Sequence, residues 1–150
     1  MVRTQSSLVI DGSAPAVWAY LCDVGRWPEW APTVRECWVG DGAPLEPGAR
    51  VEQRAKGIFG TTRHRAQHAT VVEAPRRLAF AGPMGTSAAR WGMELEPTDD
   101  EQTETRMWIE VELEGVMRAI PERVLESRIQ RVSDLEMVLI KTAVESGGPA

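Results

Sequence analysis

Four polar side chains carry most of the potential chemistry of this sequence: Gln53, His64, His68 and Thr70. Histidine is the commonest general acid or base, so His64 and His68 are the candidate catalytic groups. They lie four residues apart in TTRHRAQHATVVEA, a run that reads as one long strand. That spacing places their Cα atoms about 13 Å apart at about 3.3 Å per residue, too far to share one metal ion without a bend. We therefore expect no metal and no cofactor, and a purely structural role for both histidines is the competing interpretation.

Motifs and composition exclude several other classes of protein. G-x-S-x-G, a glycine-rich phosphate loop and H-E-x-x-H are all missing from the sequence. The chain has 150 residues, a net charge of −5 and no block of Lys and Arg, which argues against nucleic acid as a partner. It contains no apolar run of about 18 residues and no apolar leader in MVRTQSSLVIDG, so we expect neither a membrane span nor a signal peptide. Cys22 and Cys37 lack metal-ligand spacing, and we expect reduced thiols in a cytoplasmic protein.

The elements that must position these residues follow a simple order. A strand at 6–11 precedes a helix capped by Ser13, and GRWPEWAP forms a second, very short helix bounded by its two prolines. Six strands joined by short turns follow, which predicts an antiparallel meander. A long helix from about Pro121 to Glu145 ends the chain. We expect one domain over 1–146 and a disordered tail at 147–150.

The long helix is predicted to cover the sheet with one apolar stripe. Leu125, Val132 and Leu139 recur every seven residues, and further apolar residues lie beside them. Val132 is therefore expected to be buried against the sheet. The prediction is an α+β fold, in which a curved antiparallel sheet has its apolar face closed by this helix.

Alternation along each strand assigns residues to the inner or the outer face of the sheet. Arg63, Arg65 and Gln67 are expected to point outward because burying all three without partners would be costly. Their neighbours His64, Ala66, His68, Thr70 and Val72 would then point inward. The other strands contribute an inner set that is mostly apolar: Val51, Gln53, Ala55, Ala89, Trp91, Met93, Leu95, Met107, Ile109, Val111 and Leu113. The faces of the 34–40 strand stay undecided.

Several strings resemble the START-like (SRPBCC) superfamily, also known as the polyketide cyclase/dehydrase and lipid-transport family, which includes the birch pollen allergen. They are APAVWAYLCDVGRWPEW, the L-x-P-G-A loop from Leu45 to Ala49, VVEAPRRLAF, and the terminal amphipathic helix. The resemblance covers almost the whole chain. It implies a helix-grip fold, with a seven-stranded sheet wrapped around the long helix and an apolar cavity between them. It does not imply a single activity, since members include binding proteins and enzymes.

In this fold the short helix pair closes one end of the sheet, which bears on Trp27 and Trp30. Three residues apart, they share one face of the short helix and either plug the core or line the cavity. Turns at Gly57–Gly60 and Gly82–Gly85 are expected to frame the cavity mouth through apolar tips. The full set of candidate ligand-binding residues is Trp27, Trp30, Gln53, Phe59, His64, His68, Thr70, Met84, Trp91, Met93, Met107 and Ile109.

Three functions stay open at this point. The first is a carrier or sensor of a small hydrophobic or aromatic molecule, of polyketide, lipid or isoprenoid type. The second is a polyketide cyclase or dehydratase that uses His64 or His68 as its acid–base group. The aromatase/cyclases that this sequence resembles carry a cavity arginine on the long central strand, whereas Arg63 and Arg65 are assigned outward here and Thr70 takes the inward place, which argues against cyclisation. The third is an interaction protein similar to the chaperone activators of the superfamily, although no exposed apolar stripe is evident, and a homodimer is left open.

Overall fold

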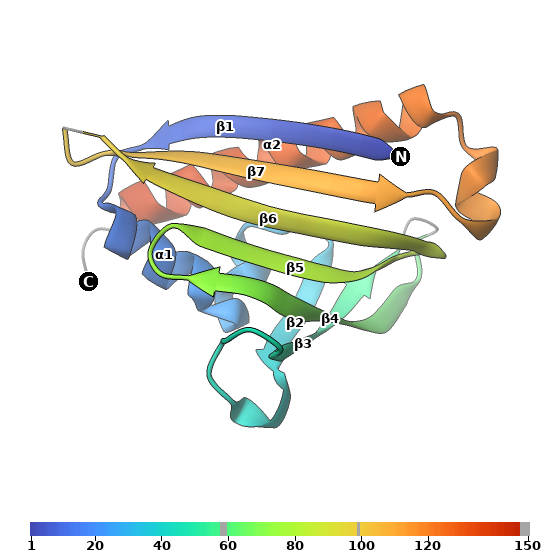
Figure 1. Cartoon of the computed structure of the whole chain (residues 1–150), viewed down its shortest axis with the longest axis horizontal. Coiled ribbons are helices and arrows are strands. Elements are labelled where there is room, and N and C mark those ends of the chain that lie inside the picture. The colour runs from blue at the N-terminus through green and yellow to red at the C-terminus, as the bar shows by residue number, and fades with distance from the viewer. Residues whose placement is uncertain (58–59, 99, 148–150) are drawn as a thin grey trace.

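The computed structural model describes residues 1–57, 60–98 and 100–147. Two short helices follow the first strand, six strands follow them, and a long helix ends the chain (Figure 1). The bounds, with η for 3₁₀ helices, are β1 Val2–Ile10, α1 Ala14–Cys22, η1 Val24–Glu29, β2 Val34–Val39, η2 Gly40–Gly42, β3 Arg50–Lys56, β4 Thr62–Glu73, β5 Arg77–Met84, β6 Ser87–Pro97, β7 Thr103–Glu112, η3 Gly115–Ala119 and α2 Glu122–Gly147.

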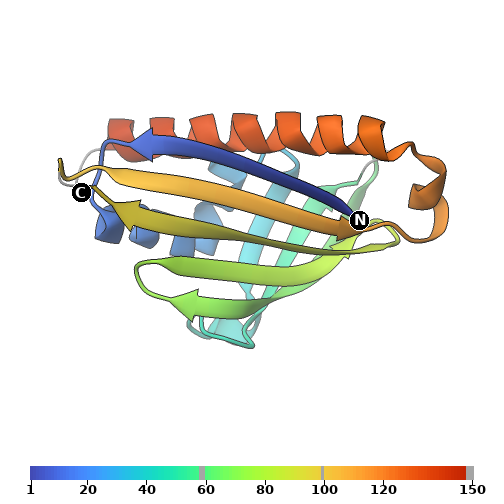
Figure 2. The same cartoon turned by 45° about the horizontal axis from the view of Figure 1, so that its top comes forward.

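The strands form one seven-stranded antiparallel sheet in the order β1-β7-β6-β5-β4-β3-β2. Strands β2 to β7 are a meander, and β1 closes the order beside β7. The long helix α2 runs along β1 on the concave side of the curved sheet (Figure 2). This is the α+β helix-grip arrangement expected from the sequence. None of the helices among the described residues combines the length and apolarity needed to cross a membrane.

Local sequence explains the two short helices. The Ser13 side chain accepts a hydrogen bond from the Ala16 backbone N–H at 3.3 Å, and Pro15 occupies the first turn, where no backbone donor is required. The second helix is 3₁₀ in form and contains Pro28, which removes a backbone donor and keeps the segment short. Its six residues present Trp27 to the core.

Buried apolar side chains form two clusters. The larger one joins α1, η1 and the strands from β2 to β7, and it contains Trp27, Trp30, Phe80, Met93 and Met107. The smaller cluster joins Val2, Ala89 and Val111 to η3 and the first half of α2. Both clusters lie between the sheet and its helices, so most of the core residues assigned from strand alternation are confirmed.

The apolar stripe of α2 differs from the prediction. Its buried residues are spaced four positions apart, and the last pair three apart: Leu125, Ile129, Ser133, Met137 and Ile140. Val132 is 42% exposed, so the expectation that it packs against the sheet is wrong. A seven-residue repeat drifts by about 20° per heptad around a straight helix, and the row through Val132 therefore runs along the margin of the buried face.

The helix also carries apolar residues that face solvent. Val124, Leu135 and Val138 are exposed along with Val132. This exposed apolar set was not foreseen from the sequence, because the predicted stripe placed Val132 and Leu135 on the covered side of the helix. Gly147 belongs to α2 rather than to a tail, and residues 148–150 lie outside the described residues.

Candidate functional site

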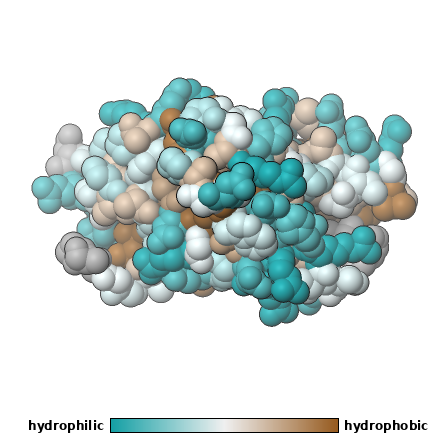
Figure 3. Space-filling model, turned by 90° about the horizontal axis from the view of Figure 1, so that it is seen from below, coloured by the Kyte–Doolittle hydropathy of each residue, from teal (hydrophilic) through white to brown (hydrophobic). Residues whose placement is uncertain are grey.

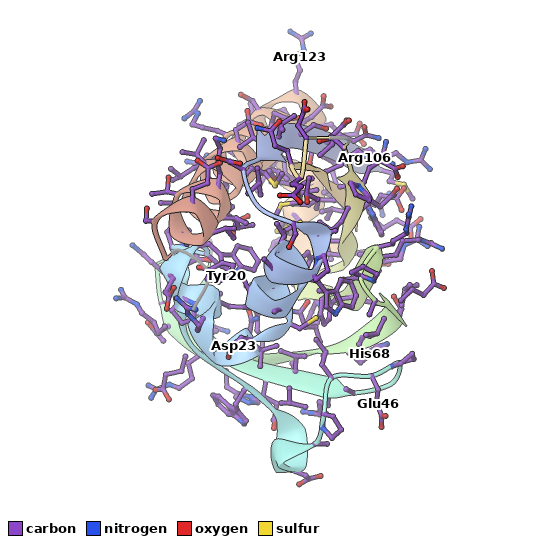
Figure 4. All side chains as sticks on the ribbon, turned by 90° about the vertical axis from the view of Figure 1, so that its left-hand side faces the viewer. Tyr20, Asp23, Glu46, His68, Arg106 and Arg123 are labelled. Carbon is purple, nitrogen blue, oxygen red and sulfur yellow. The ribbon has the colours of Figure 1, made fainter. Side chains whose placement is uncertain are left out.

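Strand β4 presents its two faces the opposite way from the prediction. Its register pairs Arg65 with Gln53 and Gln67 with Val51, and both partners on β3 are buried. Arg65 and Gln67 therefore face the interior. His64, His68 and Thr70 are exposed on the outer face, so the assignment of these three to a cavity is wrong. In the end-on view His68 lies toward the outside of the curved sheet (Figure 4).

A bulge separates the wrongly predicted part of β4 from the part that was predicted correctly. The pairing of β4 with β5 shifts register between Ala69 and Val71, where one extra residue is accommodated. Beyond the bulge Val72 points inward, as predicted, and it packs against the larger core cluster. The prediction made from Arg63, Arg65 and Gln67 put the residues before the bulge on the wrong face, and the extra residue is the reason that Val72 is nevertheless inward.

Arg65 and Gln67 can face the interior because their polar groups have hydrogen-bond partners there. The Arg65 Nε–H donates to Gln53 Oε1 at 2.6 Å, and the Trp91 Nε1–H donates to Gln67 Oε1 at 2.6 Å. Gly82 permits the second contact, since a Cβ at this position would lie 2.6 Å from the Cβ of Gln67. The premise that Arg65 and Gln67 could not be satisfied inside was therefore incorrect.

The two histidines belong to the solvated face. The His64 Nε2 lies 3.2 Å from Glu52 Oε1, and the imidazole ring lies 6.0 Å from the ring of Trp38. The His64 side chain is 51% exposed. Neither histidine is placed to act on a molecule held in the interior, which leaves the acid–base role assigned to them without geometric support.

A polar row crosses the concave face on three neighbouring strands. Cys37 of β2 pairs with Gln53 of β3, which pairs with Arg65 of β4. The Gln53 amide, only 1% exposed, donates from Nε2 to Cys37 Sγ at 3.9 Å and accepts from Arg65. Burial raises the pKa of the Cys37 thiol to about 12, so this group is neutral. These contacts hold the Arg65 guanidinium in one place. The burial of Cys37 also shows which face of β2 is turned inward, a point that the sequence left undecided.

Glu136 of α2 acts on this row from the helix side. Burial raises the pKa of its carboxyl to about 8, and the positive charge of Arg65 partly opposes that rise. Burial also lowers the pKa of Arg65, while Glu136 raises it. Sequence reasoning missed Glu136, although one signal was available: it follows buried Ser133 by three positions and precedes buried Ile140 by four, so it belongs to the covered side of the helix.

Four aromatic rings form the apolar part of the site. Trp27 meets Trp30, Phe80 and Trp91 with ring centroids 5.7, 5.1 and 5.4 Å apart, and Phe80 stacks on Trp91 at 4.8 Å. Trp27 is 1% exposed and Trp30 is 3% exposed. The Trp27 Nε1–H donates to the Leu21 carbonyl at 2.8 Å, whereas the Trp30 Nε1–H has no partner among the described residues. Both tryptophans of GRWPEWAP therefore plug the core, and Trp91 stays partly exposed beside them.

The remaining predicted residues are distributed between the two clusters. Met93 and Met107 are buried in the larger one, and Ile109 is half-buried against both. Met84, expected at the cavity mouth, packs against the smaller cluster. Phe59, together with the neighbouring tip of that turn, lies outside the described residues.

Surface features elsewhere do not suggest a second centre of chemistry. Two open hollows lie over β5, β6, β7 and β1 and are lined by a mixture of charged, polar and apolar residues, among them Arg90, Arg106 and Glu110. Within residues 1–57, 60–98 and 100–147, no three potential metal ligands converge. Seen from below, the surface is mostly hydrophilic, and its apolar atoms are scattered (Figure 3).

Comparisons with known proteins agree with the geometry. The fold is similar to a START superfamily protein from Mycobacterium smegmatis, with a TM-score of 0.79, 14% identity and coverage of 97% of this chain and 99% of that one. It is also similar to the ZhuI aromatase/cyclase from Streptomyces sp. R1128, with a TM-score of 0.78, 14% identity and coverage of 99% and 96%. The protein Ara h 8.0201 matches with a TM-score of 0.72, 13% identity and coverage of 96% and 97%.

At these identities the structural likeness establishes the fold alone. A search of curated proteins finds no match. The sequence itself matches the family described as polyketide cyclase / dehydrase and lipid transport over residues 1–145. Because that match spans nearly the whole chain, the protein belongs to the polyketide cyclase / dehydrase and lipid transport family.

Proposed function

We propose that this protein binds a small hydrophobic or aromatic molecule between its sheet and α2, as a carrier or sensor. One observation carries the proposal: the concave face is apolar but incompletely covered. Trp91, Ile109, Val72 and Leu139 all pack against the core and yet remain partly exposed. Partly exposed aromatic and aliphatic side chains around a few convergent polar groups are typical of a small-molecule site.

The position of α2 supports a ligand site on the concave face. The helix packs closely along β1, at one edge of the sheet, and meets α1 and η1 more briefly (Figure 2). The middle of the sheet is therefore covered by side chains rather than by the helix backbone. Side chains can change rotamer more easily than packed backbones can separate, so a flat ligand could enter beside Trp91.

The ligand classes that fit are polyketides, isoprenoids and lipids with a flat or chain-like apolar body. Aromatic rings at Trp91 and Phe80 offer stacking surfaces, and Gln53, Gln67 and Arg65 offer polar contacts at one side. Titration with an anilinonaphthalene sulfonate probe should quench tryptophan emission and enhance probe emission in the native protein.

Two variants make that experiment specific. Replacing Trp91 with Leu should weaken probe binding about tenfold or more by removing the stacking surface. The matched change of exposed Trp38 to Leu removes a tryptophan from the outer face and should leave the affinity unchanged. If both variants bind equally well, the probe is held elsewhere, and the proposed site is wrong.

A second candidate function is polyketide cyclisation. The inward position of Arg65, opposite to the prediction, removes the objection based on a missing cavity arginine. A guanidinium there could polarise a ketone, and the Glu136 carboxyl could exchange a proton near neutral pH. Turnover of a poly-β-ketone thioester, lost in Arg65→Gln and kept in Arg54→Gln, would support it. Binding without turnover would leave the carrier or sensor role.

A further inference from the structure

Arg65 and Glu136 form an unusual pair of ionisable groups on the inner side of the sheet, where each is only partly exposed. The guanidinium makes one hydrogen bond to the described residues, from its Nε to Gln53. No carboxylate among those residues forms an ion pair with it, although Glu136 is near enough to shift its pKa. Its two terminal nitrogens, which form the bidentate side of the fork, thus have no protein acceptor in the described part of the chain.

The charges around Glu136 are few. Arg65 is the charged group that acts on it from the sheet, and Cys37, facing Arg65 from β2, is neutral. Its neighbours one turn away along α2 are uncharged: Val132, Ser133, Leu139 and Ile140. The face of β1 toward the helix contributes Thr4, a hydroxyl. The charged groups at the junction of α1 and η1 surround Tyr20 instead: Asp23, Arg26 and Glu29. Glu29 accepts a hydrogen bond from the Tyr20 hydroxyl.

The pair therefore carries a net positive charge when Glu136 holds its proton. Burial makes the protonated carboxyl the favoured form at neutral pH, because its pKa is raised to about 8. In that state the Arg65 fork offers donors only, and the neighbouring Glu136 carboxyl carries no charge. A group that matches the fork must accept hydrogen bonds and carry a negative charge, and a carboxylate fits both requirements.

We propose that the molecule bound beside Trp91 is an amphipathic carboxylic acid, whose carboxylate binds the Arg65 fork. This inference rests on the proposed function, since it assigns the polar end of the same ligand. The apolar body would lie on the aromatic cluster, and Gln53 would hold the guanidinium in place. A neutral ligand with the same apolar part would cover the Arg65 guanidinium without compensating its positive charge. The site therefore selects against such a ligand.

The pH dependence follows from the same arrangement. As the pH rises through about 8, Glu136 loses its proton and becomes a negative charge that repels the bound carboxylate. Affinity for the acid should therefore be highest below pH 8 and fall above it. By linkage, binding of the acid between pH 8 and 9 should take up a proton from solution.

The test compares two fluorescent probes, dansyl-undecanoic acid and its methyl ester, on the full-length protein. We expect the acid to bind about tenfold or more tightly than the ester at pH 7, consistent with a charge-assisted hydrogen bond. Equal affinities would overturn the carboxylate inference and leave the proposed function intact. Failure of both probes to bind would overturn the proposed function and this inference together.

Variants assign the effect to the two residues. Arg65→Gln should abolish the preference for the acid, and Arg65→Lys, which keeps the charge without the fork, should retain part of it. Arg54→Gln, on the outer face of β3, is the matched control and should change nothing. Glu136→Gln should bind the acid as the native protein does at pH 7 and lose the decline above pH 8, whereas Glu126→Gln should keep it. A decline that persists in Glu136→Gln would contradict the assignment.

Discussion

On the inner and outer sides of the sheet lie the same kinds of side chain, but the outer ones are in contact with water and the inner ones are largely shielded from it. Arg65, Glu136 and Trp27 lie inside, whereas Arg54, Glu52 and Trp38 lie outside. On the outside, Arg54 pairs with Glu36, where water screens the two charges, and Glu52 lies beside His64. Inside, burial shifts the pKa of Arg65 and of Glu136. The chemistry of a residue is thus set by the face on which the fold places it.

The largest effect should come from a charge placed on the inner side of α2. Met137→Asp puts an unpaired carboxylate at a fully buried position and should cost about 4 kcal/mol or more, enough to unfold a domain of ordinary stability. Val132→Asp, on the exposed margin of the same helix, should change the free energy of unfolding by less than about 1 kcal/mol. Urea denaturation of both variants compares the two sides. A similar loss in each would restore the seven-residue stripe as the packing face.

The next largest difference in stability should be between variants of two tryptophans, Trp27 and Trp38. Trp27→Ala removes a side chain in contact with three other rings and should cost about 3–5 kcal/mol. Trp38→Ala, on the outer face, should cost less than about 1 kcal/mol. Thermal or chemical unfolding followed by circular dichroism measures both losses. Comparable values would mean that the aromatic cluster is not the core of this end of the sheet.

The buried carboxyl should make stability depend on pH. Because the folded-state pKa of Glu136 is raised to about 8, above that of the unfolded chain, the folded state binds more protons between roughly pH 4.5 and 8. Its contribution to stability is therefore present at low pH and is lost as the pH rises through that window. Glu136→Gln should be more stable than the native protein by about 1–3 kcal/mol at pH 8.5, with a smaller gain at pH 5.

The matched control for this pH effect is the exposed Glu126 on the same helix. Glu126→Gln should show no gain that grows with pH. Urea unfolding of both variants at pH 5, 7 and 8.5 gives the comparison. A gain for Glu136→Gln that is constant across the three values would contradict a raised pKa in the folded state.

The smallest effects should come from the outer histidines. His64→Ala removes a solvent-exposed pair with Glu52 and should change stability by less than about 1 kcal/mol. His68→Ala should leave binding of the dansyl probe unchanged within error, since its side chain lies on the opposite face of β4 from Arg65. Isothermal titration measures the affinity. A loss of binding in either variant would mean that a ligand contacts the outer face of the sheet.

The sequence by itself determined the order of elements and most of the core. Backbone geometry imposes a period of two on strands and 3.6 on helices, so local pattern was sufficient to find the meander, the capped helix at Ser13 and the long terminal helix. The inner faces of β3, β6 and β7 followed from the same period. Those strands lack a bulge over the inward residues in question, and their outward residues are charged.

Only the tertiary structure decided the face of β4 and the partners of its polar residues. One extra residue near Ala69 makes the two parts of β4 alternate out of step, and a bulge depends on the neighbouring strand rather than on local pattern. Burying Arg65 is tolerable because Gln53 accepts its Nε–H and Glu136 lies near, on elements 12 and 71 positions away in the chain. Such distant compensation has no local signature, so the inner polar row became visible only once the strands and α2 were in place.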